Sequence, residues 1–501
     1  MNILASVFEK KGLDSFLGKI IRKGDIVYAT GKTAEFLNSS GIDAVSTSSL
    51  SGFDELLGGR VKTLVPSIFA GILSNRDPKS NDELKALKFP LFDMVVSNLY
   101  PFRDASRTGD LGAMIENIDI GGVSLIRAAA KNYAHVTVIT GPDEYGRVSQ
   151  VIALNGSVPL KMREELAVKA FAVAAQYDIE IYNSLTQKLL PEKRMENLFL
   201  SFQDGIRLRY GENPDQEAFM YHGTDGLGIP NALQMSGKEL SYNNILDSNA
   251  AYETAIEFED PTVVIVKHLT PCGVASSGKL SEAYKKAFEA DPESAYGFVM
   301  SSNREIDHDT ASIIAKNFAE VVVAPSYSQE AFEILRKRKN LRILRSNFTP
   351  DMSMRIRSVS GGILAQTPLR AMPIQPELKT AVGASPEAME DLIFAWKVVA
   401  HSRSNAIVLA KSRTVTGMGS GQTSRVRALK IAGELAGKKA EGSVLASDAY
   451  FPFADSVEEA RRLGIRAIIQ PGGSIRDEEV IKKCEEYSIP LYFTGKRVFL
   501  H

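Results

Sequence analysis

The sequence predicts an α/β fold that is divided into at least two domains. The chain has 501 residues, more than a single hydrophobic core usually organises. Short apolar runs alternate with amphipathic stretches along nearly its whole length, as strands alternate with helices in largely parallel sheets. Hydrophobic residues make up 44% of the chain and charged residues 24%, proportions typical of a soluble globular protein.

The alternation is clearest towards the two ends of the chain. Near the start we expect strands at residues 3–7, 25–29 and 92–97 and helices at 13–22 and 33–40. Near the end we expect helices at 457–463 and 477–487 and strands at 465–470 and 491–494. Between them, the β-branched run 263–266 predicts a buried strand. No low-complexity tract and no fixed-period repeat is evident.

A stretch of mixed composition at 186–205 separates two regions that are rich in chemically active residues. We therefore expect one domain at 1–195 and a second at 200–501. Several prolines fall at 368–386 and predict a further division inside the second domain.

Charge and cysteine content exclude several classes of protein. Lys and Arg total 59 against 60 Asp and Glu, so attraction of the whole chain to nucleic acid is not indicated. The two cysteines supply no disulfide framework and no thiolate metal site, and the six histidines show no His-x-x-x-His spacing. No signal-peptide pattern and no membrane-length apolar window is visible. We expect a cytoplasmic protein that binds neither zinc nor a membrane.

Three turns in the first domain carry the residue types that bind a phosphate or another small anion. Gly31-Lys32-Thr33 follows a strand and opens a helix, where backbone N–H groups and the helix dipole favour negative charge. It is not a phosphate-binding P-loop, because Ile26 stands where that motif needs glycine. The second turn carries Arg60, Lys62 and Thr63, and the third is Asp119-Ile120-Gly121-Gly122, followed by Arg127 and Lys131.

The second domain contains a pair of residues suited to acid–base chemistry. Lys267 and His268 follow the 263–266 strand, which places a cation beside an imidazole that carries protons near neutral pH. The other histidines are more often structural or exposed. Polar segments around this pair extend the candidate site, at 209–214, 241–247, 402–406, 415–425 and 471–477. The glycine-rich run at 417–421 fails the dinucleotide fingerprint because Gln422 takes the third glycine position, and it suits a mononucleotide phosphate or a pteridine-like ring better.

These segments together resemble one family, the bifunctional AICAR transformylase/IMP cyclohydrolase of purine biosynthesis, where AICAR is 5-aminoimidazole-4-carboxamide ribonucleotide. The motifs that carry the resemblance are Gly-Gly-Arg-Val-Lys-Thr-Leu at 58–64, Asn-Leu-Tyr-Pro-Phe at 98–102, Asp-Ile-Gly-Gly-Val at 119–123, Arg-Tyr-Gly-Glu-Asn-Pro at 209–214, Lys-His…Pro-Cys-Gly at 267–273, Gly-Ser-Gly-Gln…Ser-Arg at 419–425 and Ser-Asp-Ala-Tyr-Phe-Pro-Phe at 447–453. They run in order through both halves of the chain. The resemblance implies a methylglyoxal-synthase-like parallel-sheet domain, then a transformylase region of two cytidine-deaminase-like α/β subdomains without zinc.

In this family the first domain closes the purine ring of the formylated intermediate, FAICAR, to give IMP. The resemblance implies that the nucleotide is bound by Ser6, Lys10, Thr30, Gly31, Thr33, Arg60, Thr63 and Gly121. It assigns charge stabilisation to Lys62 and Lys131, and proton transfer to Tyr100 and Asp119.

The second domain would transfer a formyl group from 10-formyltetrahydrofolate to the 5-amino group of AICAR. By resemblance His268 moves the proton, Lys267 stabilises developing negative charge, and Asn405 faces the reactants. AICAR or folate would be held by Arg209, Tyr210, Asn243, Gln422, Arg425, Pro471, Ser474 and Arg497. The family places this site across the interface of a homodimer. Whether a monovalent cation binds is left open.

The first nucleotide turn departs from the family pattern, with Phe8, Lys11 and Lys32 at positions that usually hold small residues and Val65 at a usual histidine. Two alternatives therefore stay open. The chain could be a transformylase whose first domain is vestigial, or it could be a sensor of purine precursors that does not catalyse.

Overall fold

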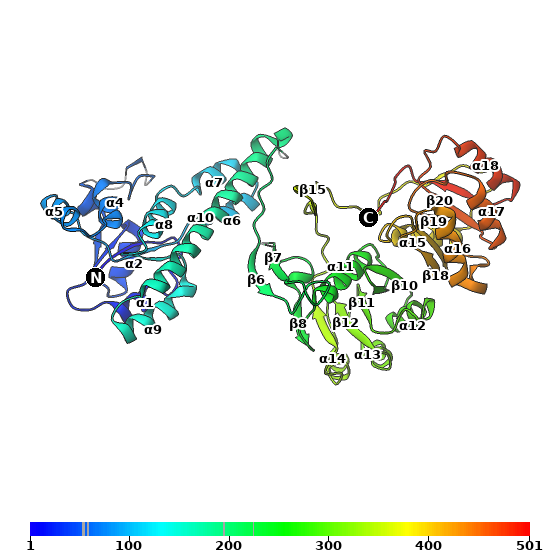
Figure 1. Cartoon of the computed structure of the whole chain (residues 1–501), viewed down its shortest axis with the longest axis horizontal. Coiled ribbons are helices and arrows are strands. Elements are labelled where there is room, and N and C mark those ends of the chain that lie inside the picture. The colour runs from blue at the N-terminus through cyan, green and yellow to red at the C-terminus, as the bar shows by residue number, and fades with distance from the viewer. Residues whose placement is uncertain (53–55, 58–59, 194–195, 224) are drawn as a thin grey trace. The chain divides into compact units, whose positions relative to one another are not determined.

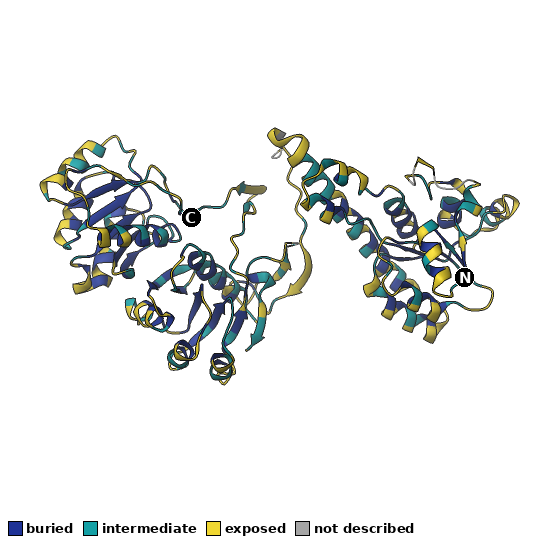
Figure 2. Ribbon diagram, turned by 180° about the vertical axis from the view of Figure 1, so that it is seen from behind, coloured by how far each residue is buried: buried dark blue, intermediate teal, exposed yellow. Residues whose placement is uncertain are grey.

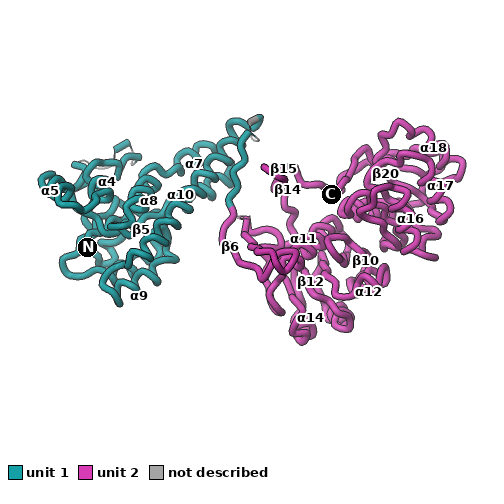
Figure 3. The backbone as a smooth tube through the Cα atoms, viewed as in Figure 1, with its two compact units in different colours: residues 1–201 teal, residues 202–501 magenta. Residues whose placement is uncertain are grey.

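The computed structural model describes residues 1–501 apart from 53–55, 58–59, 194–195 and 224. The chain forms two compact units, Met1–Ser201 and Phe202–His501 (Figure 3). Gly58 and Gly59 of the second predicted anion-binding turn lie outside the described residues.

The first unit is drawn in blue to cyan in Figure 1. It is built on a five-stranded sheet in the order β3-β2-β1-β4-β5. The strands are β1 (Asn2–Ser6), β2 (Ile26–Ala29), β3 (Ala44–Ser46), β4 (Met94–Ser97) and β5 (Thr137–Ile139). All four strand pairings are parallel, so the carboxyl ends of the strands share one edge. Around it lie α1 (Leu13–Ile20), α2 (Gly31–Ser39), α3 (Ser48–Ser51), α4 (Pro66–Leu73), α5 (Pro78–Ala86), α6 (Phe102–Arg107), α7 (Leu111–Glu116), α8 (Gly121–Lys131), α9 (Tyr145–Asn155) and α10 (Leu160–Leu189).

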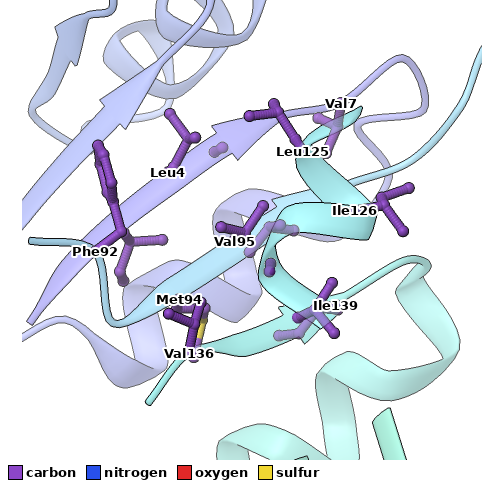
Figure 4. Close-up of a cluster of buried hydrophobic side chains, with 14 of the residues drawn as sticks. Leu4, Val7, Phe92, Met94, Val95, Leu125, Ile126, Val136 and Ile139 are labelled. Atoms are coloured by element: carbon purple, nitrogen blue, oxygen red, sulfur yellow. The ribbon is translucent and has the colours of Figure 1, made fainter. Parts of the chain in front are cut away.

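Apolar strands and the apolar faces of helices form the core of this unit. Figure 4 shows Leu4 of β1, Val95 of β4 and Ile139 of β5 beneath Leu125 and Ile126 of α8. All five side chains are fully buried. Strands with continuous apolar runs are covered on both faces in parallel sheets, which is why this part of the fold could be predicted from the sequence.

The second unit contains a twelve-stranded sheet in the order β16-β21-β20-β19-β17-β18-β10-β9-β11-β12-β13-β8. Its strands are β8 (Leu233–Ser236), β9 (Thr262–Lys267), β10 (Thr270–Ser276), β11 (Phe298–Ser302), β12 (Ala319–Ala324), β13 (Arg342–Arg345), β16 (Glu377–Leu378), β17 (Ile407–Lys411), β18 (Thr414–Gly419), β19 (Val444–Ser447), β20 (Ala467–Gln470) and β21 (Leu491–Phe493). Its helices are α11 (Tyr242–Ile256), α12 (Leu280–Ala290), α13 (His308–Ile314), α14 (Gln329–Leu335), α15 (Pro386–Val399), α16 (Arg425–Ala436), α17 (Asp455–Arg462) and α18 (Asp477–Glu486). The predicted α/β fold is confirmed.

The two halves of this sheet repeat one topology. In each half a central strand pairs antiparallel with both of its neighbours, two parallel pairings follow, and a short antiparallel strand closes the edge. Helices α11 and α15 contribute to one apolar cluster that is shared by both halves, and β10 joins β18 at Ala275 and Thr414. The second half begins at β16, inside the region where prolines predicted a division.

The repeat also has a sequence signature that the sequence analysis missed. Five residues recur 144 positions later in the chain: Ser241 and Ser385, Asp247 and Asp391, Lys267 and Lys411, Thr270 and Thr414, Gly273 and Gly417. Both serines cap their helix, and a Cβ on either glycine would collide with the carbonyl oxygen of Ala287 or Ala432. Within each half, the matching residues are separated by stretches that differ between the two halves. The repeat can therefore be recognised only when the two halves are aligned by their strand order.

Two small hairpins stand outside the large sheet. One pairs β6 (Gln203–Arg207) with β7 (Phe219–His222), and the other pairs β14 (Arg355–Val359) with β15 (Gly362–Gln366). Figure 2 shows the second hairpin largely in the colour of exposed residues. Within the described residues, no helix is both long and apolar enough to cross a membrane.

Candidate functional site

The first predicted anion-binding turn lies where strands β1 and β2 end. The Thr30 hydroxyl donates to Ser6 Oγ and to Thr33 Oγ1, each at 3.4 Å, and Thr33 Oγ1 donates to the carbonyl of Val7 at 3.2 Å. Helix α2 begins at Gly31 with Thr30 as its N-cap. No cap hydrogen bond from the Thr30 side chain satisfies the first turn, so the helix N-terminus faces the strand ends with free N–H donors.

The third predicted turn brings several candidate residues together. Asp119 is buried and accepts a hydrogen bond from the Gly122 N–H at 2.6 Å. A Cβ on Gly121 would lie 2.8 Å from the Thr63 hydroxyl, so only glycine allows this close approach. Backbone hydrogen bonds from Gly122 and Tyr100 and the charge of Lys62 all act on the Asp119 carboxylate.

Burial raises the pKa of Asp119, although these hydrogen bonds and the Lys62 charge oppose the rise. A carboxylate of this kind accepts a proton more readily than an exposed aspartate. Tyr177 of α10 holds the same segment, since its hydroxyl accepts from the Asp119 N–H at 2.9 Å and donates to the Asn117 carbonyl at 2.6 Å. Sequence reasoning missed Tyr177, which lies 58 residues from Asp119 along the chain.

Other residues predicted for the first domain lie apart from this cluster. Arg60 is exposed and pairs with Glu116, and the Lys10 ammonium donates to the Phe8 carbonyl at 3.2 Å. Lys131 is exposed at the last position of α8, a rise of about 15 Å along the helix from Gly121. The side chain of Lys131 is therefore not gathered with Asp119 in this structure, and its predicted role stays a prediction.

The departures in the first domain are accommodated by the fold. Phe8 is half exposed and packs edge-on against Tyr100, with 5.7 Å between ring centroids. Val65 is buried, whereas Lys11 and Lys32 are exposed. None of the four side chains disrupts the sheet or the turn at Thr30.

In the second unit, Lys267 ends β9, and His268 and Leu269 form the sharp connection to β10. His268 and Leu269 have φ values of 50° and 65°, and Thr270 pairs with Lys267 across the hairpin. The Lys267 ammonium donates to the carbonyls of Tyr296 at 2.7 Å and Gly297 at 3.0 Å, which uses two of its three N–H groups. The turn leaves the imidazole of His268 exposed to solvent.

Thiol chemistry beside this turn is disfavoured. Burial raises the pKa of Cys272 to about 12, so its side chain stays protonated near neutral pH. The role of His268 as proton carrier stays a prediction.

Arg209, Tyr210 and Asn243 gather near the first half of the sheet. The Arg209 guanidinium lies 4.7 Å from the centroid of the Tyr210 ring, and Asn243 donates to the Glu212 carbonyl at 3.3 Å. The neighbouring Asn244 is buried, completes a capping box with Ser241, and donates to Glu320 at 2.9 Å. Of the two adjacent asparagines, only Asn243 is exposed.

The second half of the sheet gathers another set of predicted residues. Asn405 Oδ1 accepts from Arg425 at 2.7 Å, and Asn405 Nδ2 donates to the Gln422 carbonyl at 2.8 Å. Arg425 and Asp448 are both buried and paired with each other. Because Asp448 and Asn405 occupy the Arg425 guanidinium, Arg425 is placed to orient Asn405 rather than to meet a ligand alone.

The C-terminal segment runs beside this set. Ser404 and Leu500 exchange two hydrogen bonds, and the Val498 N–H donates to the Asp448 carbonyl at 3.0 Å. Pro471 accepts from the Gly495 N–H at 3.0 Å, and Ser474 Oγ accepts from the Arg476 N–H at 3.1 Å.

Arg497 lines a cavity of about 850 Å³ in the second unit. Three further arginines line it, Arg355, Arg357 and Arg370, together with two acidic residues, Glu253 and Asp351, which both pair with Arg355. The four arginines outnumber the two carboxylates, so the cavity suits an anion. Lys267, His268 and Asn405 do not line this cavity. Within the described residues, no cluster of three or more His, Cys, Asp or Glu side chains is arranged to hold a metal.

Comparison with known proteins covers both units. The family model described as "AICARFT/IMPCHase bienzyme" matches residues 129–435, and the model described as "MGS-like domain" matches residues 12–124. The second match confirms the predicted methylglyoxal-synthase-like first domain.

Full-length relatives are also found, each with the name "Bifunctional purine biosynthesis protein PurH". Those of Acetivibrio thermocellus and Ruminiclostridium cellulolyticum are 46% and 44% identical over 512 and 509 residues, and each alignment covers 99% of both chains. That of Persephonella marina is 44% identical over 516 residues with the same coverage. The chain therefore belongs to the AICARFT/IMPCHase bienzyme family.

Proposed function

We propose that this chain carries out the last two steps of IMP synthesis. It transfers a formyl group from 10-formyltetrahydrofolate to AICAR and then closes the ring of FAICAR. The observation that carries the proposal is that predicted acid–base residues lie in each of the two units, Asp119 in the first and His268 in the second. The nucleotides and the folate are its small-molecule partners, and we place it in the cytoplasm.

In the transformylase step the 5-amino nitrogen of AICAR attacks the formyl carbon. A C–N bond forms, the bond from that carbon to N10 of the folate breaks, and one amine proton has to reach N10. His268 suits this proton transfer because its ring is exposed and an imidazole can both accept and donate a proton. Lys267 keeps one N–H free of the Tyr296 and Gly297 carbonyls, which suits it to stabilise the oxyanion.

In the cyclohydrolase step the carboxamide nitrogen of FAICAR attacks its formyl carbon, and the carbinolamine then loses water. Both groups sit on one imidazole ring, so correct positioning supplies much of the acceleration. Asp119 suits the role of proton acceptor, with Lys62 stabilising charge and the Tyr100 backbone hydrogen-bonded to the Asp119 carboxylate. The N-terminus of α2 and the Thr30 turn suit the nucleotide phosphate.

We also propose that the protein is a homodimer whose transformylase site is completed by the second copy. Hairpin β14–β15 pairs only with itself in the large unit and exposes Ile356, Val359, Ile363 and Leu364. A lone hairpin is marginally stable in water. The separation of the Arg497 cavity from the His268 turn within one chain supports the same proposal.

Separate assays of the two half-reactions test these roles. We expect His268→Ala to abolish formyl transfer and leave FAICAR cyclisation intact, and Asp119→Asn to do the reverse. Ser412→Ala is the matched control for His268, because Ser412 occupies the same position in the repeated turn with φ of 53°. If His268→Ala turns over AICAR normally, the proposed mechanism is wrong. If the unaltered protein cyclises FAICAR only at the uncatalysed rate, its first unit is vestigial, and if neither half-reaction occurs, the sensor reading holds.

A further inference from the structure

The His268 turn is held by a carboxylate that sequence reasoning gave no catalytic role. Asp247 lies on the second turn of α11, and its Oδ1 accepts the Leu269 N–H at 2.7 Å. His268 and Leu269 both have positive φ, the backbone of a type I′ hairpin turn, which Asn and Gly adopt far more readily than His and Leu. A bond from a neighbouring helix to this backbone fixes the direction in which the imidazole leaves the sheet.

The second half of the sheet builds the same device at Ser412 and Arg413. Their φ values are 53° and 52°, and Asp391 of α15 accepts both N–H groups, at 2.9 and 2.6 Å. The lysine that precedes each turn is also tied to a carbonyl of the opposite segment: Lys411 donates to Glu441 at 3.1 Å, as Lys267 donates to Tyr296. The helix-borne aspartate and the lysine therefore build the turn, whatever residue occupies its first position.

We propose that Asp247 is a positioning residue for formyl transfer, which holds the His268–Leu269 turn and keeps a negative charge beside the imidazole. The proposal rests on the proposed role of His268 as proton carrier. Of the two turns, only the one at 268–269 carries an imidazole. Loss of the aspartate should therefore affect formyl transfer only at that turn. Asp391 supplies the structural role alone.

The charges that act on this turn come from two elements. Asp247 belongs to α11 and Lys267 to β9. The Asp247 carboxylate interacts electrostatically with Lys267 and with His268. A carboxylate stabilises a protonated imidazole beside it. Burial raises the pKa of Asp247, and the neighbouring charges of His268 and Lys267 oppose that rise.

The test compares Asp247→Ala with Asp391→Ala in the full-length protein, with both half-reactions measured. We expect Asp247→Ala to lower the kcat of formyl transfer on the order of 10²-fold, the penalty of a misplaced catalytic group. FAICAR cyclisation should be unchanged in the same preparation, which shows that the chain is folded. Asp391→Ala should lower the melting temperature at least as much, because Asp391 also pairs with Arg466, yet leave formyl transfer within a few-fold. Equal losses of formyl transfer in the two variants would overturn the proposal.

Asp247→Asn separates the hydrogen bond from the charge. Its side-chain oxygen still accepts the Leu269 N–H, so we expect most of kcat to return. A residual loss that the matched Asp391→Asn does not show would measure the contribution of the negative charge, and full recovery of kcat in Asp247→Asn would overturn the charge component. His268→Ala is run alongside: if it is fully active, the proposed role of His268 fails, whereas an inactive His268→Ala with an active Asp247→Ala contradicts only the role of Asp247.

Discussion

His268 combines an unfavourable backbone conformation with a proposed role in the chemistry. A left-handed conformation costs an L-residue about 1–2 kcal/mol, and His268 adopts it next to Leu269, which adopts it too. Such strain persists only where surrounding contacts fix it, and it concentrates at functional sites. The bonds from Asp247 and Lys267 supply those contacts here.

The environment of Asp119 predicts the pH dependence of ring closure. Burial raises its pKa and the Lys62 charge opposes that rise, so loss of the charge raises the pKa further. If the ionised carboxylate accepts the proton, we expect Lys62→Gln to move the acidic limb of the FAICAR cyclisation profile to higher pH, besides lowering its maximum. Arg60→Gln is the control, because Arg60 pairs with Glu116 on the surface. An acidic limb that stays in place in Lys62→Gln would contradict the assignment of Asp119.

The pair of His401 and Glu257 predicts a stability effect in the second unit. His401 Nε2 lies 3.2 Å from Glu257 Oε1, and their side chains are 13% and 8% exposed. Burial disfavours ionisation of Glu257, but the hydrogen bond and charge of His401 outweigh it and lower its pKa. The lowered pKa of Glu257 therefore stabilises the folded chain above the pKa of an unfolded glutamate, roughly 4.3. This stabilisation is lost as the pH falls through the pKa of Glu257 in the folded chain.

We expect His401→Ala to lower the free energy of unfolding by about 1–3 kcal/mol at pH 7, because a buried carboxylate loses its partner. The difference from the unaltered protein should shrink below about pH 4 as Glu257 becomes protonated. Urea titration followed by fluorescence measures the free energy of unfolding. The single tryptophan, Trp396, is buried and donates to the carbonyl of Ala371, whose N–H donates to Glu257. His308→Ala, which removes an exposed histidine, should change stability by less than about 0.5 kcal/mol, and equal effects of the two variants would refute the role of the buried pair.

At the scale of elements, the sequence predicted those whose apolar pattern is local. Strand β1, helix α1 and the 263–266 strand match their predicted positions within a few residues, because their core-facing residues repeat at the period of the element. Lys267 and His268 could be found for the same reason, since they directly follow such a strand. The roles of Asp247, Asp448 and Tyr177 could not be predicted, although the first two lie in segments already singled out. Their partners are 22, 23 and 58 residues away, and only the folded chain brings them together.

Hairpin β14–β15 predicts how copies of the chain associate. Its exposed apolar side chains lose contact with water only if another surface covers them. We expect Leu364→Asp to convert the dimer to a monomer in sedimentation velocity and to reduce formyl transfer while FAICAR cyclisation continues. Leu154→Asp is the control, since Leu154 is even more exposed but lies on α9 in the first unit. A Leu364→Asp protein that remains dimeric would exclude the hairpin as the contact.

At the scale of the whole molecule, two units with separate cores carry separate predicted sites on one chain. Both sites lie where strands of an α/β sheet end, the usual place for ligands in such folds. Joining the two activities has a chemical rationale: favourable ring closure removes the formylated product and draws an unfavourable formyl transfer forward. This coupling requires that both units be active.

The most direct test is mass-resolved product analysis of the purified, full-length protein incubated with AICAR and 10-formyltetrahydrofolate. The account predicts that IMP and tetrahydrofolate appear together in equal amounts. Accumulation of FAICAR without IMP would contradict it by confining activity to the second unit. Absence of any formylated product would contradict formyl transfer by the second unit and with it the central claim.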